Sequence, residues 1–407
     1  MKKCSIVIGS LWGDEGKGHM TDILCAKGNS LNVRFNGGAQ ASHTVVTPDG
    51  KRHAFRHFGA GTFAGAKTYL SEQFIVNPPA FVKERNELCD KFAILPTVFV
   101  NPECIVTTPW DMYINQAIET VRGEDRHGSC GMGINETVER SKDERYKITV
   151  CDLLFKELLI PKLKKIETEY VENRLKHEYG LTISDLPDEY AKALTDKRNI
   201  DMFVFYINEF LKDVKVLGDS VLKRFDNIVF EGAQGLLLDQ NNTEYFPHVT
   251  TSNTGIKNVM DILQKNAFKG KVDIYYMSRC YITRHGAGPL ANEITDKPYS
   301  KVEDLTNVPN EFQGALRYSY LNFDLLSKEI LKDLRNLKLP ANINVVFTCI
   351  DQLESKFNFI VNKATNTIES SNILEVAYNL LKEKIKDINN VYATSGLTRE
   401  AFVSLKE

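Results

Sequence analysis

The sequence predicts an α/β fold: a single large domain with a mostly parallel central sheet, helices on both faces and a P-loop-like nucleotide site. Short runs rich in β-branched and aromatic residues recur along the chain. Several are apolar throughout, which is typical of strands covered on both faces. Amphipathic stretches with helical spacing lie between some of these runs. Glycine-rich or polar segments follow the runs, and ligands of parallel sheets bind beyond the carboxyl ends of the strands.

The expected elements follow from these patterns. We expect strands at residues 5–9, 31–38, 97–100, 227–232, 272–277, 344–348 and 390–394. We expect helices at residues 22–27, 258–266, 323–336 and 373–388. The stretch 151–224 is rich in Lys, Glu and Leu and nearly free of glycine, which predicts a helical insertion with Pro161 as a kink or boundary. Residues 1–407 are therefore expected to form one domain that carries this insertion.

Composition narrows the class of protein. The chain has 407 residues, 43% of them hydrophobic, which is enough for a sizeable core. A net charge of −2 implies no field that attracts nucleic acid or a membrane surface, so neither partner is expected. The eight cysteines form no C-x-x-C pair, and no apolar run approaches membrane-spanning length. Scattered cysteines favour a reduced compartment, and we expect a cytoplasmic protein.

The segment "GSLWGDEGKGH", residues 9–19, carries the first candidate chemistry. Gly13, Gly16 and Gly18 allow close backbone approach to phosphate oxygens, and Lys17 would add a positive charge. Asp14 could bind magnesium or take a proton. A Walker loop has Ser or Thr after its lysine and carries no such acid pair. The alternative is an ordinary glycine-rich turn, but the strand before the loop and the helical "MTDILCA" after it favour a phosphate site.

Four further loops offer suitable side chains. "RFNGGAQASHT" contains His43, which could be a general acid or a structural histidine. "HGSCGMGIN" offers Ser129 and Cys130 for a second phosphate, unless it is only a flexible turn. In "EGAQGLLLDQ" the amide of Gln234 could read a base edge. "PHVTTSNT" offers hydroxyls, including Thr250, in what could also be a polar loop with capping residues.

The ordered set of motifs resembles the adenylosuccinate synthetase family. The motifs are "WGDEGKG", "GGAQASHTVV", "FEGAQGLLLD", "VTTSNT" and "TRHGAGP", and they span most of the chain. The resemblance implies a ligase of purine nucleotide biosynthesis that joins L-aspartate to C6 of a 6-oxopurine nucleotide, normally IMP, to give adenylosuccinate. It implies GTP hydrolysis through a 6-phosphoryl intermediate, a magnesium ion and a homodimer.

The resemblance also implies roles for individual residues. Asp14 would bind magnesium and act as the catalytic base, and His43 would bond to the transferred phosphoryl group and act as an acid. Lys17 would spread the developing charge, Gln234 would hold the base, and the carbonyl of Ser42 would meet magnesium. The expected nucleotide contacts are Gly13, Glu15, Gly16, Gly18, Gln40, Ser129, Cys130, Arg140, Thr250, Asp351, Thr394 and Gly396. Arg140, in "ETVERS", would reach across a dimer interface onto the nucleotide of the neighbour.

Several departures from the family pattern leave the substrates open. The aspartate loop reads "FQGALRYSYLNFD" and keeps only Arg317 of an arginine cluster, so Arg284 and His285 are the nearest helpers. Asp351 survives in "TCID" and would accept the guanine N–H groups, which favours GTP, but the lysine that packs on guanine is lost and ATP stays possible.

Three functions therefore remain in view. The first is an IMP–aspartate ligase. The second is a paralogous ligase that uses dGMP or another purine nucleotide, ATP or another amino acid. The third is a non-catalytic purine nucleotide-binding protein. Retention of Asp14, Lys17, His43 and Gln234 together favours an enzyme, because binding alone needs neither a base nor an acid. A viral branch that aminates dGMP replaces the loop aspartate with serine, so Asp14 favours IMP.

Overall fold

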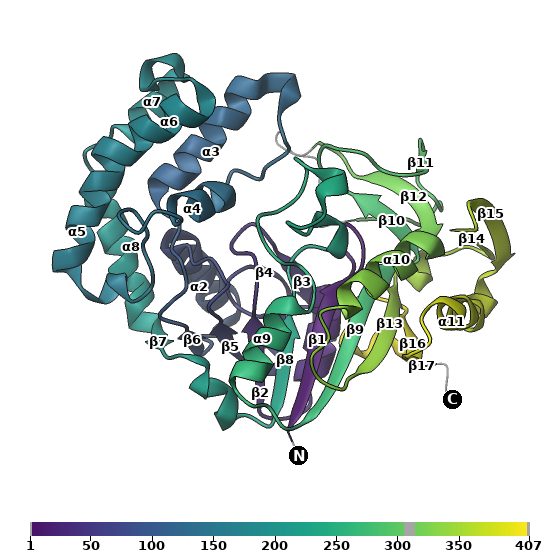
Figure 1. The fold of residues 1–407 in the computed structure, drawn as a ribbon. Coiled ribbons are helices and arrows are strands. Elements are labelled where there is room, and N and C mark those ends of the chain that lie inside the picture. Colours follow the sequence, from purple (N-terminus) through teal and green to yellow (C-terminus); the bar gives the residue numbers. More distant parts are fainter. Residues whose placement is uncertain (1, 305–313, 405–407) are drawn as a thin grey trace.

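The computed structural model describes residues 2–304 and 314–404, and a ten-stranded sheet runs through its centre (Figure 1). All neighbouring strands pair in parallel except β17, which is antiparallel to β16. In spatial order the strands are β17 (Phe402–Ser404), β16 (Ile388–Thr394), β13 (Asn342–Thr348), β9 (Lys271–Arg279), β1 (Lys3–Gly9), β8 (Asn227–Glu231), β2 (Ser30–Arg34), β5 (Lys67–Leu70), β6 (Val98–Val100) and β7 (Val214–Val216). The predicted α/β class with a mostly parallel sheet is confirmed.

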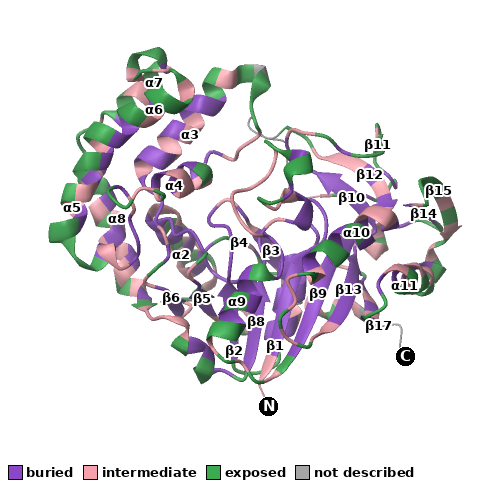
Figure 2. Ribbon diagram, in the orientation of Figure 1, coloured by how far each residue is buried: buried purple, intermediate pink, exposed green. Residues whose placement is uncertain are grey.

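Helices cover both faces of this sheet. On one face, Ile6 and Ile8 of β1 pack in a core cluster with α9 (Lys257–Lys265), α10 (Phe323–Leu334) and α11 (Ile373–Lys384). On the other face, Val7 packs with Met20 and Leu24 of α1 (Lys17–Cys25). Successive side chains of β1 thus pack into two different cores, one on each face of the sheet. The central strands are buried (Figure 2).

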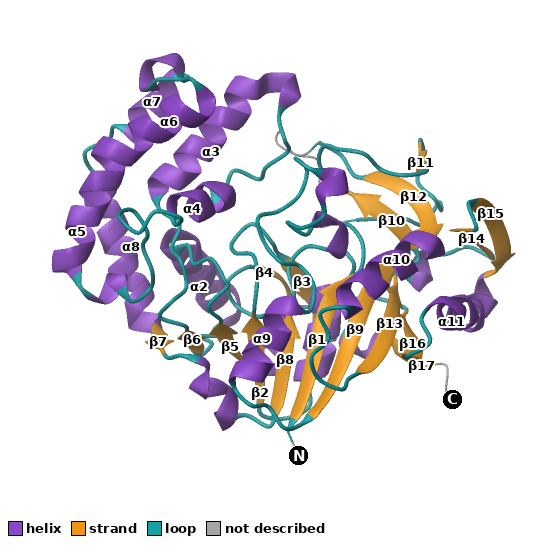
Figure 3. Ribbon diagram, in the orientation of Figure 1, coloured by secondary structure: helices purple, strands orange, loops and turns teal. Residues whose placement is uncertain are grey.

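The stretch 151–224 is helical, as predicted. It contains α5 (Lys156–Lys165), α6 (Val171–Tyr179), α7 (Asp188–Leu194) and α8 (Asn199–Asp213), and Pro161 lies inside α5. These helices lie with α2 (Pro78–Phe92), α3 (Pro109–Arg122) and α4 (Ile134–Arg140) beside one edge of the sheet (Figure 3). The helical region therefore begins earlier than the sequence predicted, and β7 in the predicted insertion extends the main sheet.

The predicted strands all form, but several elements were not predicted. β5 belongs to the main sheet, and β3 (His43–Val46) pairs with β4 (Arg52–Phe55) as a hairpin. A second sheet contains β10 (Tyr281–Arg284), β11 (Glu293–Ile294), β12 (Arg317–Asn322), β14 (Lys356–Val361) and β15 (Ala364–Glu369). α1 begins at Lys17 rather than at residue 22, because Gly16 ends the glycine loop in a left-handed conformation (φ 83°) directly at the helix.

One buried ion pair connects α3 to α4. Arg140 and Asp111 are fully buried, with 2.9 Å between Arg140 Nε and Asp111 Oδ1. Arg140 also donates to the backbone carbonyls of Val106 (2.7 Å) and Tyr146. All sides of the guanidinium are therefore satisfied within the chain.

We expect the substitution Arg140→Leu to destabilise the fold, because it leaves the carboxylate of Asp111 buried without its cation. Such a loss costs about 3–5 kcal/mol. The free energy of unfolding is measured by urea denaturation followed by circular dichroism. Arg145→Leu is the matched control: that arginine is exposed and pairs with Asp143, so its loss should leave the free energy of unfolding nearly unchanged. Equal stability of both variants would contradict the prediction.

Candidate active site

The glycine loop between β1 and α1 packs directly on the turn that follows β8. A Cβ atom on Gly9 would lie 2.5 Å from the carbonyl oxygen of Gln234, and one on Gly235 would lie 2.3 Å from the carbonyl oxygen of Leu11. Backbone therefore lies against backbone, which only glycine allows. Gln234 itself adopts a left-handed conformation (φ 65°). Two motifs far apart in the sequence thus form one surface, as the parallel-sheet prediction requires.

Glu15 folds back into the loop that contains it. Its carboxylate accepts hydrogen bonds from the backbone N–H groups of Leu11 (2.8 Å) and Gly13 (3.2 Å), and the residue is 4% exposed. Burial raises the pKa of Glu15 to about 8, against the opposing charge of Lys17. Burial also lowers the pKa of Lys17. Glu15 therefore shapes the loop from inside with its carboxylate, and its predicted contact with a nucleotide stays a prediction.

Asp14 is the exposed acidic residue of the loop. It adopts φ 55°, and its backbone oxygen accepts a hydrogen bond from Nε of Arg279. Arg279 in turn forms an ion pair with Asp304 (2.7 Å). Within residues 2–304 and 314–404, no hydrogen bond or ion pair engages the Asp14 carboxylate. The main chain of Asp14 is thus held firmly while its carboxylate is free to act on a ligand.

His43 forms a buried pair with Glu231, the last residue of β8. His43 Nδ1 hydrogen-bonds to Oε1 of Glu231, whose Oε2 accepts from the backbone N–H of Ala60 (3.0 Å). Burial opposes ionisation of Glu231, but the charge of Arg34 and the bond from His43 outweigh it and lower the pKa of Glu231 to about 2. Because an ionised carboxylate only accepts, Nδ1 carries the proton and Nε2 is left for a ligand.

Glycine also brings this pair to the loop. A Cβ atom on Gly18 would lie 2.8 Å from the Cβ atom of His43, so the first turn of α1 and the histidine are in close contact. Burial lowers the pKa of His43, although Glu231 opposes the shift. Glu231 and Arg34 were not singled out from the sequence. The signal for Glu231 was an acid at the carboxyl end of an apolar strand, immediately before a glycine turn.

Buried polar atoms without a hydrogen-bond partner gather on these loops. Within the described residues they include both amide atoms of Gln40, Nε1 of Trp12, Oγ of Ser10, Oγ1 of Thr251 and Nδ1 of His248. Gln40 lies beside the turn after β8, since a Cβ atom on Gly37 would meet both Gln40 Nε2 (3.2 Å) and Ala233 Cβ (2.9 Å). Unsatisfied buried polar groups are rare in proteins and mark places where a ligand or water completes the bonding.

The predicted second phosphate loop is already occupied by an internal carboxylate. Glu119 of α3 accepts from the backbone N–H groups of Gly128 (3.0 Å) and Ser129 (3.1 Å), and the hydroxyl of Ser129 donates to Asn115 (2.8 Å). Burial raises the pKa of the Cys130 thiol. A phosphate group at this loop must therefore compete with Glu119 for these amides.

The motif that contains Asp351, which is predicted to bind guanine, follows β13 and lies near Gly16 of the glycine loop. A Cβ atom on Gly16 would lie 2.7 Å from Cγ2 of Thr348, the last residue of β13. Asp351, just beyond, accepts a hydrogen bond from the N–H of Gly396 (3.1 Å), and Thr394 ends β16. Thr250 donates its N–H to the carbonyl of Leu238 (2.8 Å), in the segment after the Gln234 turn.

The three predicted amino-acid contacts also lie together, and each is engaged within the chain. Arg284 is 3% exposed, lies 3.7 Å over the ring of Trp12 and has its pKa lowered to about 10 by burial and by Arg317. Arg317 grips the carboxylate of Glu293 through Nε (2.8 Å) and Nη2. His285 Nε2 hydrogen-bonds to the carbonyl of Gly314 (3.0 Å). Arg317 thus forms a bidentate fork, and Glu293 occupies it. Residues 312 and 313 of this loop lie outside the described residues.

Arg140 does not fit its predicted role. Its side chain is fully buried and its donors are committed to Asp111, Val106 and Tyr146. A residue that crosses a dimer interface needs an exposed guanidinium, so the assignment of Arg140 to the nucleotide of a neighbour is wrong.

The residues around the glycine loop fit a magnesium ion shared with phosphates. No group of three or more His, Cys, Asp or Glu side chains that could hold a metal occurs in the described part of the chain. Magnesium is usually bound by one or two carboxylates together with phosphate oxygens and water rather than by a protein cage. The unengaged carboxylate of Asp14 is suited to that mode of binding.

The sequence of the chain is similar to that of one known family. A family model for adenylosuccinate synthetase matches residues 6–316. The adenylosuccinate synthetase of Coxiella burnetii (strain RSA 331 / Henzerling II) is 29% identical over 356 residues, which cover 86% of this chain and 76% of that protein. The enzyme of Limosilactobacillus reuteri (strain DSM 20016) is 30% identical over 295 residues, 72% of this chain and 65% of that protein. The enzyme of Tolumonas auensis is 32% identical over 307 residues, 73% of this chain and 66% of that protein.

Solved structures show the same fold. A fully ligated adenylosuccinate synthetase from Plasmodium falciparum aligns with a TM-score of 0.76 at 16% identity and covers 99% of both chains. The succinoaminodeoxyadenylate synthetase of cyanophage S-2L aligns with a TM-score of 0.57 at 14% identity and covers 99% of this chain. No helix among the described residues is long and apolar enough to span a membrane. The family match over most of the chain, together with the ordered loops around one glycine-rich turn, shows that this chain belongs to the adenylosuccinate synthetase family.

Proposed function

We propose that the chain is an adenylosuccinate synthase-type C–N ligase that joins L-aspartate to C6 of IMP with hydrolysis of GTP. The proposal rests on two groups that one glycine loop brings to the same region. One is the carboxylate of Asp14, which no side chain of the described residues engages, and the other is the ring of His43, which Glu231 orients. A base and an oriented acid beside a phosphate-binding loop serve catalysis, whereas a nucleotide sensor needs neither. The buried unpaired amide of Gln40 supports a nucleotide in the same place.

The first step activates the base oxygen. Asp14 removes the proton from N1 of the purine, and the electron pair that remains makes the C6 oxygen a nucleophile toward the γ-phosphate. The bond from this oxygen to phosphorus forms as the bond to the β-phosphate oxygen breaks. Lys17 and the Nε2–H group of His43 in its protonated form stabilise the charge on the transferred group. Magnesium, held by Asp14 and the carbonyl of Ser42, would supply further neutralisation of phosphate charge.

The second step forms the carbon–nitrogen bond. The amine of aspartate attacks C6, and the phosphate leaves with the former C6 oxygen while the amine loses a proton. The two carboxylates of aspartate need positively charged or hydrogen-bond-donating partners. We assign this role to Arg284, His285 and Arg317. Arg317 must exchange Glu293 for the substrate, because its fork holds one carboxylate at a time.

Family membership further supports a homodimer, a cytoplasmic location, and GTP as phosphoryl donor through Asp351. Because Arg140 is committed inside its own chain, a dimer would not depend on that residue for its active site. The paralogous alternative, dGMP or ATP in place of IMP or GTP, rests on the altered loops and is decided by the experiment below.

We expect the purified protein to convert IMP, aspartate and GTP into adenylosuccinate, identified by product mass. IMP, dIMP, GMP and dGMP are each offered with GTP or ATP, and the twenty amino acids compete as amine donors. Asp14→Asn and His43→Ala should each lower kcat at least about 100-fold, the usual contribution of an acid or base. Glu375→Gln, an exposed acid on α11, is the control and should leave kcat unchanged.

The same assay decides between the alternatives. A higher kcat/KM with dGMP, with ATP or with another amine would replace that substrate in the proposal. Nucleotide binding without any product, or full activity in Asp14→Asn, would overturn the ligase assignment.

We expect Glu231→Gln to shift the alkaline limb of the pH–rate profile to lower pH. The pKa of Glu231 is about 2, so its carboxylate is negative throughout the working range and favours protonated His43. Without that charge, burial and the positive charges of Arg34 and Lys17 act on His43 unopposed, its pKa falls, and the acid form is lost at a lower pH. The measurement is kcat against pH for both proteins. An unchanged alkaline limb would show that His43 does not act as the acid.

We expect opposite effects on aspartate binding from the two partners of the Arg317–Glu293 pair. Arg317→Lys should raise KM for aspartate about tenfold, because lysine cannot form the bidentate fork. Glu293→Gln should lower this KM a few-fold, since the competing exposed carboxylate is removed. Glu144→Gln, another exposed acid, is the control. If KM for aspartate is unchanged in both variants, Arg317 does not bind the amino acid.

A further inference from the structure

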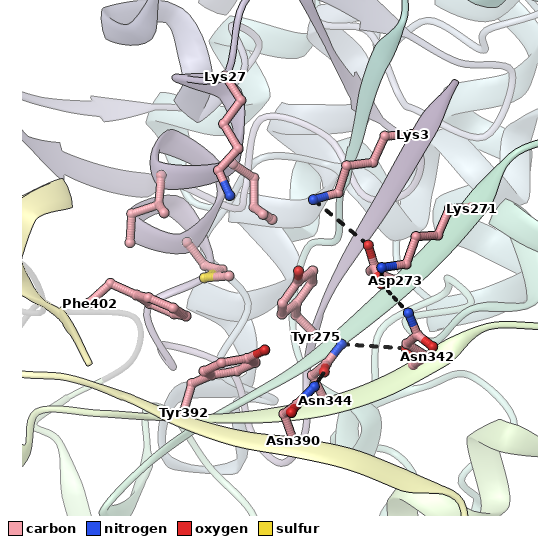
Figure 4. Close-up of a pocket in the computed structure, with 13 residues that line it drawn as sticks. Lys3, Lys27, Lys271, Asp273, Tyr275, Asn342, Asn344, Asn390, Tyr392 and Phe402 are labelled. Atoms are coloured by element: carbon pink, nitrogen blue, oxygen red, sulfur yellow. Dashed lines mark hydrogen bonds and ion pairs between the residues drawn. The ribbon is translucent and has the colours of Figure 1, made fainter. Parts of the chain in front are cut away.

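A cavity of about 290 Å³ lies at the opposite end of the main sheet from the proposed active site (Figure 4). Lys3, Lys271 and Asn342, the first residues of β1, β9 and β13, line it. The motif loops follow the last residues of these strands, so the two places are separated by the length of the sheet. Met20 and Leu24 of α1 form part of the wall, which puts the cavity on the α1 face.

The floor of the cavity is polar, which is unusual for the face of a parallel sheet. Farther along the same face, Val7, Met277 and Val346 pack against α1. Strands covered on both faces normally keep this apolar pattern throughout. In the cavity the floor is instead a hydrogen-bonded set: Asn342 Nδ2 donates to Asp273 Oδ1 at 2.6 Å, and Asn390 Nδ2 donates to Asn344 Oδ1 at 3.0 Å.

The cavity carries excess positive charge. Lys3 Nζ lies 3.8 Å and Lys271 Nζ 3.6 Å from the carboxylate of Asp273, which is the one acid among the described residues that line the cavity. Lys27 also points into it and has no ion-pair partner within the described part of the chain (Figure 4). Burial and the charge of Lys3 both lower the pKa of Lys27. Three lysines against one carboxylate leave an unbalanced charge that an anion would neutralise.

An aromatic wall stands beside these lysines. The rings of Tyr392 and Phe402 lie 5.0 Å apart at 37° to each other, and Tyr275 follows at 6.5 Å from Tyr392. The two nearer rings stand together at one side of the cavity, with the ammonium groups of Lys3 and Lys27 on another (Figure 4). Flat aromatic rings at such spacing can accept a further ring in a stacked or edge-on contact.

We propose that this cavity binds a small planar aromatic anion. Its ring would lie against Tyr392 and Phe402, and its anionic group would lie between Lys3 and Lys27. The pocket is close in size to the smaller ligand pockets of proteins, roughly 300 Å³. The ligand would also touch α1, the helix that begins at Lys17 of the glycine loop, so the cavity and the active site share a structural element.

The test uses naphthalene-2-sulfonate as the probe and isothermal titration calorimetry as the measurement. Neutral 2-naphthol and non-aromatic methanesulfonate are the comparison ligands. Lys27→Gln removes one unpaired charge and Tyr392→Leu removes one ring while it keeps an apolar side chain. Lys164→Gln, an exposed lysine on α5, is the control variant. Thermal unfolding of each variant confirms that it folds.

We expect saturable binding of naphthalene-2-sulfonate at one site and much weaker binding of the two comparison ligands. Lys27→Gln and Tyr392→Leu should each weaken binding about three- to tenfold, and Lys164→Gln should not. The proposal is overturned if the probe does not bind, if it binds equally well to both cavity variants, or if 2-naphthol or methanesulfonate binds as tightly as the probe.

Discussion

The site depends on one close contact, the packing of the glycine loop after β1 on the turn after β8. Parallel pairing of β1 with β8 brings the two carboxyl ends to the same edge, and Gly9 and Gly235 let the two backbones meet without side chains between them. Asp14 and Lys17 emerge from one segment, and Gln234 emerges from the other. Any side chain at either glycine would separate these groups by the width of a methyl group or more, so the constraint fixes both the fold at this edge and the geometry of the chemistry.

At this edge of the sheet, buried charged residues support one another in sequence. Arg34 keeps Glu231 ionised, and Glu231 orients His43 through Nδ1, which leaves Nε2 for a ligand. Each step removes a conformational or protonation choice from the next residue, which is the role of a supporting shell in a preorganised site. Asp14 lies outside this chain of contacts, with a fixed backbone and a free carboxylate. His43, the proposed acid, is thus held rigidly, whereas Asp14, the proposed base, can respond to a substrate.

The sequence could predict this edge but not what surrounds it. Continuous apolar runs and glycine-rich ends follow directly from a buried parallel sheet, so the strands and their loops were predictable. The second sheet was not, because strands such as Ala364–Glu369 are largely exposed and carry no apolar run. The burial of Arg140 was hidden as well, since a charged residue in a short helix gives no sign of its partner. Glu119 and Glu293 engage groups that are 10 and 24 residues away, and no helix or strand periodicity links these positions.

The distribution of satisfied and unsatisfied groups divides the site into two halves. Around the glycine loop, polar atoms of Gln40, Trp12 and Thr251 are buried without partners, and each costs about 1–3 kcal/mol until a ligand completes its bonding. At the other half, Glu119 already accepts from the backbone N–H of Ser129, and Glu293 accepts from Nε and Nη2 of Arg317. In the first half, a ligand gains the whole free energy of each new hydrogen bond, because the protein group had no partner before. In the second half, it gains only the difference between its own hydrogen bond and the one to the internal carboxylate that it displaces. In the second half, a ligand's anionic group therefore binds only where it outcompetes an internal carboxylate.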